Sequence, residues 1–475
     1  MKKTILSLIF AFILSFSVLL TGCKDKGLPN NPPTQAEVFS NGGMSVVKGD
    51  YLYFVNGYVD ETTLTKDDNK AGKVKKGALY RTKLSDREID KNKDGFLNNA
   101  DLVVSKVVGF SNGGFEIIDD HIYYATPYMK LDKAGVLQSN RVEIHRIDID
   151  GTDDKVIYTT STAETELDWT MRKVGDKAYL LIYEGGKIRS VNASNGDVVG
   201  TVENSTSYAF LKETEYRYND DRTSFLNTHV VYTRSIEGSD GVFNYNGNAI
   251  SAMDIATGEI SNITISKDNT YTIKHVNEYS MYYTYTSTAV PTACLYKKAM
   301  IQGWNQDEET KLTNMAYDSY YFVDHGNDLI IATTGDFTWR LEGDVNTAPR
   351  QILSASRDII AVSGNYGYYL SDSKLIRFDI NGLDVLQDAF GDLSTLITNE
   401  NFIDFDERRV YVYAEYTASN GDKNHYLSYF ADNFANDEFK LRFVGVFEDG
   451  DVPAKPEQPE PEYEGDEVEY VPHVN

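Results

Sequence analysis

Apolar and polar positions alternate over short stretches through most of the chain between residues 37 and 447. Segments rich in tyrosine, valine and isoleucine follow polar turns that contain glycine, aspartate or asparagine, and helical spacing of apolar positions is nearly absent. Alternation of this kind fits β-strands, because successive side chains of a strand point to opposite faces of the sheet. The pattern therefore predicts an all-β body over 37–447.

The predicted strands come in pairs that recur along this body. The first strand of each pair is apolar and usually rich in tyrosine: 51–55, 122–125, 178–183, 230–233, 281–285, 329–332, 366–370 and 410–413. The second usually alternates apolar residues with arginine, serine or aspartate: 79–84, 144–149, 188–192, 250–255, 295–299, 339–341, 375–380 and 427–430. These are eight pairs in about 411 residues, or roughly 51 residues per pair, close to the period of propeller blades.

Two sequence repeats support this period. The motif Phe-Ser-Asn-Gly-Gly at 39–43 recurs at 110–114, and each copy precedes a pair of predicted strands. The segment 187–198 matches 249–260, and both read as a strand, a polar turn closed by glycine and the start of another strand. The sequence thus predicts a β-propeller of eight blades, with seven to nine compatible with the period, in which ring closure protects the sheet edges.

Several motifs resemble known propeller families. Leu-Tyr-Phe at 52–54 and Ile-Tyr-Tyr at 122–124, followed by strands such as Ile-His-Arg-Ile-Asp at 144–148, resemble the YWTD-type propellers of lipoprotein receptors and their bacterial relatives. The segments 189–197 and 251–259, the latter reading Ala-Met-Asp-Ile-Ala-Thr-Gly-Glu after Ser251, resemble PQQ-type repeats, although the tryptophan usual after Thr-Gly is missing. The resemblance implies the propeller fold, and the PQQ type includes an eight-bladed lipoprotein of outer-membrane assembly.

The amino terminus carries a targeting signal. Lys2 and Lys3 precede an almost unbroken apolar run over 5–20. The run ends in four residues that resemble a bacterial lipobox: Leu20, Thr21, Gly22 and Cys23. The resemblance implies a signal peptide over 1–22, a lipid on Cys23, and an extracytoplasmic protein anchored in the cell membrane or the outer membrane. A transmembrane anchor is the alternative, but a run of about 16 residues is short for a span of about 20.

Composition and charge define the segments that flank the body. Residues 23–36 contain three prolines and are predicted to be a flexible tether, whereas 448–475 are rich in glutamate and proline and are predicted to be a disordered acidic tail. The net charge of −26 argues against nucleic-acid partners and suits divalent cations. Cys294 is the one cysteine besides Cys23, and its strand-like surroundings predict a buried, inert thiol.

A calcium loop is predicted within an insertion at about 85–105. Oxygen donors recur at alternate positions around Gly95, which permits the sharp turn of such loops. The predicted calcium ligands are Asp90, Asn92, Asp94, the carbonyl of Phe96, Asn98 through a water, and Asp101. Aspartate at the last position resembles dockerin loops, which come in pairs, whereas this chain has one copy. The prediction is therefore a structural calcium ion.

Other polar clusters are interpreted as parts of blades. The acidic segment 148–154 is read as a turn between two strands, and 334–339 as a hairpin. The seven histidines are scattered and are predicted to be strand or loop residues. Motifs of zinc proteases, α/β-hydrolases and P-loop enzymes are absent from the sequence.

The function predicted from these features is that of a monomeric, membrane-anchored lipoprotein that binds a protein or glycan as a non-catalytic scaffold. Two alternatives stay open: an enzyme acting on extracellular polysaccharide or peptide with carboxylates in the propeller funnel, and a subunit of an envelope assembly complex. Perturbed carboxylates converging on the central channel would indicate the enzyme, whereas an exposed apolar or aromatic patch would indicate the scaffold.

Overall fold

The structure is a computed structural model, and it describes residues 28, 37–39, 45–57, 59, 64, 69, 76–83, 100–108, 114–129, 141–161, 167–211, 215–217, 224–239, 244–277, 279–301, 309–323, 329–363, 365–371, 374–385, 388–390, 403–406, 409–417, 423–431 and 441–443. Apart from a 3₁₀ turn at Phe225–Asn227, its regular elements are β-strands. Among the described residues, none forms a helix long and apolar enough to cross a membrane.

The first two sheets are built mainly from the amino-terminal part of the chain. The first, which we call blade 1, has the strand order β2 (Ser45–Lys48), β3 (Tyr51–Val55), β4 (Leu79–Lys83) and β5 (Asp101–Val104). The second, blade 2, has the order β15 (Glu215–Arg217), β1 (Glu37–Phe39), β6 (Phe115–Ile118), β7 (His121–Pro127), β8 (Val142–Asp148) and β9 (Lys155–Thr159).

Three sheets of the middle of the chain follow. Blade 3 has β10 (Leu167–Val174), β11 (Lys177–Glu184), β12 (Lys187–Asn192) and β13 (Val198–Val202). Blade 4 has β14 (Ser205–Ala209), β16 (His229–Ser239), β17 (Asn244–Asp254) and β18 (Ile260–Ser266). Blade 5 has β19 (Thr270–Asn277), β20 (Ser280–Thr286), β21 (Leu295–Ala299) and β22 (Thr310–Lys311).

The carboxyl-terminal sheets repeat the same order. One has β23 (Ser319–Phe322), β24 (Ile330–Thr334), β25 (Phe337–Leu341) and β26 (Arg350–Leu353). The next has β27 (Ile359–Ser363), β28 (Tyr366–Ser371), β29 (Lys374–Asp379) and β30 (Asp388–Phe390). The last has β31 (Ile403–Asp406), β32 (Arg409–Thr417), β33 (Lys423–Ala431) and β34 (Leu441–Phe443).

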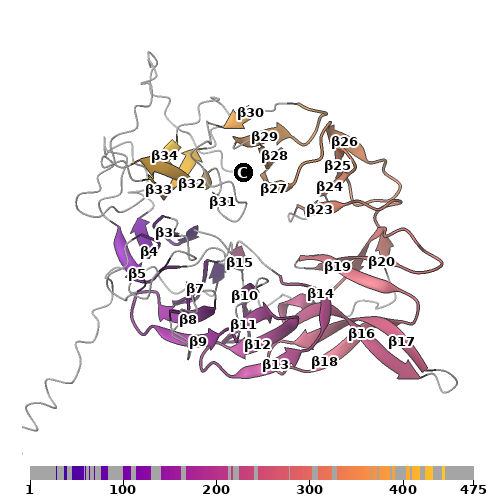
Figure 1. The fold of residues 1–475 in the computed structure, drawn as a ribbon, viewed down its shortest axis with the longest axis horizontal. Coiled ribbons are helices and arrows are strands. Elements are labelled where there is room, and N and C mark those ends of the chain that lie inside the picture. Colours follow the sequence, from indigo (N-terminus) through magenta and orange to yellow (C-terminus); the bar gives the residue numbers. More distant parts are fainter. Residues whose placement is uncertain are drawn as a thin grey trace, which may run out of the picture.

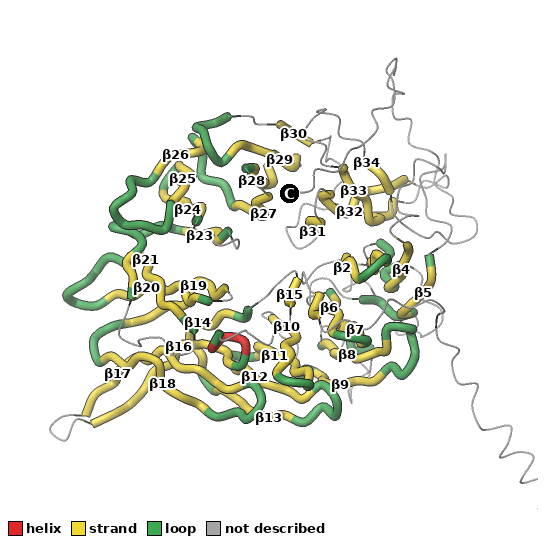
Figure 2. Tube along the Cα trace, turned by 180° about the vertical axis from the view of Figure 1, so that it is seen from behind, coloured by secondary structure: helices red, strands yellow, loops and turns green. Residues whose placement is uncertain are grey.

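The sheets follow one another around a ring, as Figure 1 and the reverse view in Figure 2 show. Neighbouring strands within each sheet are antiparallel, so a four-stranded sheet zigzags outward along the chain. The first strand of a blade lies toward the middle of the ring and the fourth lies outside. The molecule is therefore an all-β propeller, as predicted.

The predicted blade number needs a correction. The prediction of eight blades, with seven to nine compatible, holds only in its wider range: in the described part, seven sheets have the four strands of a regular blade, whereas blade 2 has six. The segment before the first full repeat supplies β1, which pairs with the inner edge of β6, and β15 pairs with the other edge of β1. Since neither strand belongs to the repeat, the pattern of paired strands could not reveal them.

The two strands that the sequence pattern marks in each repeat are the second and third strands of a sheet. For example, β3 pairs with β4, β16 with β17 and β32 with β33. These central strands have a ladder partner on both sides and are the most buried, which gives them the clearest apolar pattern.

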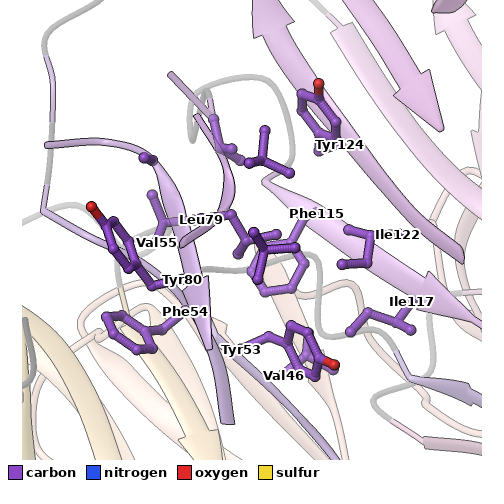
Figure 3. Close-up of a cluster of buried hydrophobic side chains, with 14 of the residues drawn as sticks. Val46, Tyr53, Phe54, Val55, Leu79, Tyr80, Phe115, Ile117, Ile122 and Tyr124 are labelled. Atoms are coloured by element: carbon purple, nitrogen blue, oxygen red, sulfur yellow. The ribbon is translucent and has the colours of Figure 1, made fainter. Parts of the chain in front are cut away.

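The core consists of side chains that meet between neighbouring blades. In Figure 3, Tyr53 and Leu79 of blade 1 lie beside Phe115, Ile117 and Ile122 of blade 2, and all five are fully buried. Burial of one such side chain contributes about 1.5–3 kcal/mol to stability. Each blade therefore depends on its neighbour for a large part of its core.

The glycine shared by the sequence repeats fixes the distance between blades. Gly196 and Gly258 close the turns between the third and fourth strands of blades 3 and 4, with φ of +77° and +75°. A Cβ at Gly196 would lie 2.8 Å from the carbonyl oxygen of Ile157, and one at Gly258 would lie 2.6 Å from that of Val199. Ile157 and Val199 belong to the fourth strand of the preceding blade, so only glycine allows this approach.

Candidate functional site

Most of the predicted site residues lie outside the described residues. These are the lipobox residues Leu20, Thr21, Gly22 and Cys23 and the calcium-loop residues Asp90, Asn92, Asp94, Phe96 and Asn98. The tail over 448–475 also lies outside them. Within the described part, no group of three or more histidine, cysteine, aspartate or glutamate side chains is arranged to hold a metal ion.

Asp101 is the predicted calcium ligand that the structure places. It is the first residue of β5, and its Oδ2 accepts a hydrogen bond of 3.2 Å from Nε of the fully buried Arg81. The Asp101 side chain is 44% exposed, so its carboxylate stays accessible to a cation. The predicted loop connects β4 to β5, that is, the third and fourth strands of blade 1.

A cluster of ionisable side chains lies where blade 1 connects to blade 2. We call it the His145 cluster, and it comprises Lys106, Tyr124, Glu143, His145 and Asp154. Lys106 lies between β5 and β6, Tyr124 lies on β7, Glu143 and His145 lie on β8, and Asp154 immediately precedes β9. The cluster thus links the segment between blades 1 and 2 to β7, β8 and β9 of blade 2.

Asp154 is the centre of the hydrogen bonds in the His145 cluster. Its Oδ1 accepts from the Tyr124 hydroxyl over 2.9 Å and lies 2.8 Å from Nδ1 of His145, while its Oδ2 accepts from Nζ of Lys106 over 2.7 Å. Nε2 of His145 lies 3.6 Å from Oε2 of Glu143. The rings of Tyr124 and His145 stack with their centroids 5.0 Å apart.

These contacts shift the pKa values of the cluster in opposite directions. Burial by itself lowers the pKa of His145, but the neighbouring carboxylates of Asp154 and Glu143 outweigh it and raise that pKa above its ordinary value. Burial by itself raises the pKa of Asp154, but the hydrogen bonds from His145 and Lys106 lower it to about 2. The cluster therefore favours a charged His145 beside a charged Asp154.

The burial of His145 decides what the cluster can do. Its side chain is 3% exposed, so a substrate has no access to either ring nitrogen. The arrangement can hold a strand and a turn together, and it can respond to pH, but it is not placed for acid–base catalysis.

Blade 5 contains a related arrangement. Tyr283 of β20 donates a hydrogen bond to Glu309, which immediately precedes β22. Tyr283 pairs with Tyr296 of β21 in the same register in which Tyr124 pairs with His145, and the two rings stack. Recurrence in two blades indicates a structural role for the hydrogen bond between tyrosine and carboxylate.

Two further buried carboxylates connect neighbouring blades. Oε2 of Glu116, on the first strand of the blade 2 repeat, accepts a hydrogen bond of 2.7 Å from the Met171 amide of blade 3. Glu184 of blade 3 accepts from the Tyr158 hydroxyl of blade 2 over 2.7 Å and from the Ser161 hydroxyl over 2.7 Å. Burial opposes ionisation of Glu184, but these hydrogen bonds lower its pKa below the ordinary value.

All carboxyl pKa shifts resolved in the described part go in the same direction. Asp153, which accepts a hydrogen bond from Lys155, and Asp344, which accepts one from the Asn346 amide, also have lowered pKa values. A catalytic carboxylic acid needs a raised pKa to keep its proton at neutral pH. The perturbed carboxylates of this part of the chain are thus stabilised anions at blade contacts and turns.

Apolar side chains are exposed at corresponding places on the outermost strands of blades 1–4. We call them the apolar row: Leu102 of β5, Val156 of β9, Val198 of β13 and Ile260 of β18, with exposed fractions of 37–51%. Each is the first or second residue of its strand. Each of these four blades thus presents one exposed apolar side chain at the same point of its outermost strand.

Sequence reasoning missed the apolar row, although the sequence contains a signal for it. The repeated turns read Gly-Asp-Val at 196–198 and Gly-Glu-Ile at 258–260. The valine and isoleucine look like ordinary strand residues until the structure shows that these strands lie at the outer edge of the ring.

Comparisons with known proteins found similar solved structures but no matching family. The chain matches no protein-family model and no curated protein. Among solved structures, it is similar to an oligogalacturonate lyase in complex with manganese, with a TM-score of 0.39 and 12% identity over 65% of this chain and 85% of that chain. It is similar to the β-propeller domain of the Trilobed protease from Pyrococcus furiosus, with a TM-score of 0.34 and 11% identity over 76% of this chain and 98% of that domain.

A third similar structure is prolyl oligopeptidase B from Galerina marginata in its apo form. The TM-score is 0.40 and the identity 9%, over 68% of this chain and 49% of that chain. The chain thus spans about half the length of that peptidase. All three similarities concern the fold alone.

Proposed function

We propose that the protein is a lipid-anchored, extracytoplasmic propeller that binds a protein or glycan of the cell envelope without catalysis. The apolar row is the observation that carries the proposal, because it places an exposed apolar side chain at the same point of four consecutive blades. The direction of the carboxyl pKa shifts supports it, since lowered values suit structural anions.

The anchor in this proposal is a lipid on Cys23, supported by the apolar run and the lipobox residues. Metabolic labelling with a radioactive fatty acid is expected to label the full chain and not the Cys23→Ala variant. The variant is expected to leave the membrane fraction. Equal labelling of both proteins would contradict the anchor.

A calcium ion bound by residues 90–101 also belongs to the proposal. The spacing of oxygen donors supports it, and the accessible carboxylate of Asp101 fits it. The ion would stabilise the long connection between β4 and β5.

Binding through the apolar row is tested with charged substitutions. Val198→Lys combined with Ile260→Lys is expected to abolish binding to the partner found with glycan arrays and envelope pull-downs. Phe337→Lys serves as the control, because Phe337 is 40% exposed and lies outside the row. Retention of binding by the double variant would reject the row as the binding surface. Turnover of an oligogalacturonide or a peptide by the purified protein would contradict the non-catalytic role.

A further inference from the structure

Leu28 fastens the segment before the propeller to blade 2. Its amide donates a hydrogen bond of 2.8 Å to the carbonyl oxygen of Asp150, in the turn between β8 and β9. Its side chain is partly buried against the apolar core of blades 1 and 2, together with Val47 and Val59. The position of the chain is therefore fixed at Leu28, within the segment predicted to be a flexible tether.

Strand direction shows which end of the ring this contact occupies. Because the strands of each blade are antiparallel, the turns between third and fourth strands all lie on the same face of the propeller disc. We call this the turn end, and it includes the turns that follow β8, β12 and β17. The connections between second and third strands, such as the β16–β17 hairpin, lie at the opposite end. Leu28 therefore sits at the turn end, on blade 2.

Leu28 is the fifth residue after Cys23, and four residues lie between them. An extended chain covers at most about 3.3–3.6 Å per residue, so this distance cannot exceed roughly 18 Å. If Cys23 carries the lipid, as the proposed function requires, the β8–β9 turn lies within that distance of the headgroups. We infer that the turn end of blades 1 and 2 faces the membrane surface, and that the hairpin end points away from it.

The charges of this corner are compatible with such a position. Asp153 pairs with Lys155 and with Arg146, and Asp154 pairs with Lys106. Two of the four aspartates in the turn over 148–154 are thus paired with lysine or arginine. Val156, which follows Lys155 on β9, adds an apolar side chain that is 49% exposed.

The orientation of the propeller on the membrane limits which kind of partner can cover the apolar row. Each residue of the apolar row lies at the beginning of a fourth strand, next to the turn end. The apolar row therefore lies on the outer rim of the propeller, close to the membrane surface. A partner that covers it must itself be held at that surface, which favours another anchored component of the envelope over a freely diffusing one.

Site-specific fluorescence quenching tests the orientation. Val156→Cys and Ile265→Cys place a label at two residues of 49% and 51% exposure, the first near the turn end and the second near the hairpin end of β18. Both are made with Cys294→Ala, which removes the buried thiol. The purified lipidated proteins are bound to phosphatidylcholine vesicles that carry a nitroxide on the headgroup.

The label at residue 156 is expected to be quenched several-fold more than the label at residue 265. Equal quenching, or stronger quenching at residue 265, would overturn the orientation. Sedimentation with the vesicles distinguishes the two proposals, because a protein that fails to sediment lacks the anchor and refutes the proposed function itself.

A second variant tests the contribution of Leu28. Leu28→Gly removes the apolar contact and is expected to reduce the difference in quenching between the two labels, because the propeller can then rotate on a longer tether. The melting temperature should stay close to that of the parent protein, since Leu28 lies at the edge of the core. An unchanged difference in quenching would overturn the role of Leu28.

Discussion

The Tyr124 hydroxyl donates a hydrogen bond of 2.9 Å to Oδ1 of Asp154 and so connects β7 of blade 2 to the start of β9, the outermost strand of that blade. Tyr283 and Glu309 form the corresponding contact in blade 5. In both blades, the bond passes the third strand, on which His145 or Tyr296 stacks against the tyrosine. The contact therefore holds the outer strand of a blade to its interior.

Tyr124→Phe is expected to lower the free energy of unfolding by about 1.5–3 kcal/mol, because it removes a hydrogen bond to a charged acceptor. Tyr232→Phe is the matched control. Tyr232 occupies a similar place on the second strand of blade 4, and within the described residues its buried hydroxyl donates to no carboxylate. Urea denaturation of both variants measures the difference, and equal losses would contradict the assigned role.

The His145 cluster is expected to make stability depend on pH. The pKa of His145 is raised in the folded protein, so the cluster stabilises the fold fully below the unfolded value of about 6.5 and loses this contribution as the pH rises through the folded value. Between about pH 6 and pH 8, the free energy of unfolding of the parent should fall relative to that of His145→Gln. Burial lowers the pKa values of His121 and His229. Both histidines are present in the parent and in the variant, so their effect on the free energy of unfolding cancels in the comparison. Parallel curves would show that His145 does not titrate in this range.

Gly258→Ala is expected to destabilise the protein more than Gly186→Ala. Both glycines have positive φ, +75° and +76°, which costs a residue with a Cβ about 1–2 kcal/mol. A Cβ at Gly186 meets nothing within 4 Å, whereas one at Gly258 lies 2.6 Å from the Val199 carbonyl of the preceding blade. The clash should add roughly 1–3 kcal/mol. Thermal denaturation of the pair isolates the contact between blades, and similar losses would show that the blades can move apart without cost.

Calcium is expected to raise the melting temperature of the protein, because an ion held by residues 90–101 would stabilise the connection between β4 and β5. Millimolar calcium should increase the melting temperature over that in EDTA, and Asp90→Ala combined with Asp94→Ala should abolish the increase. Asp344→Ala is a suitable control, because Asp344 is an exposed turn aspartate far from the loop in sequence. A parent protein that melts at the same temperature in both conditions would refute the site.

The sequence was most informative where burial is greatest. The central strands, such as β7 and β8, follow the predicted ranges within a few residues, because both faces of these strands pack against other blades. The reading of 148–154 as a turn is confirmed by the pairing of β8 with β9, and the hairpin at 334–339 by the pairing of Thr334 with Phe337. Cys294 is buried, as predicted.

The side-chain contacts between the strands of one blade were beyond sequence reasoning. Tyr124 and Asp154 are thirty residues apart, and nothing in either segment marks the other as its partner. The fourth strands have an exposed edge, so their sequence patterns resemble those of loops. In β9, for example, Lys155 and Val156 are exposed, and Tyr158 and Thr159 are only partly buried. Which strands become neighbours depends on the path of the whole chain. Local periodicity does not encode that path.

The pairing of β15 with β1 has a consequence for the order in which the ring can be completed. Residues 37–39 are made early, but the strand that covers their free edge, 215–217, belongs to the connection between β14 and β16. During synthesis, the sheet of blade 2 must wait with one open edge until more than two hundred residues have emerged. A premature stop before that point would leave this edge available to other chains, so truncated products should be the form of this protein most prone to aggregate.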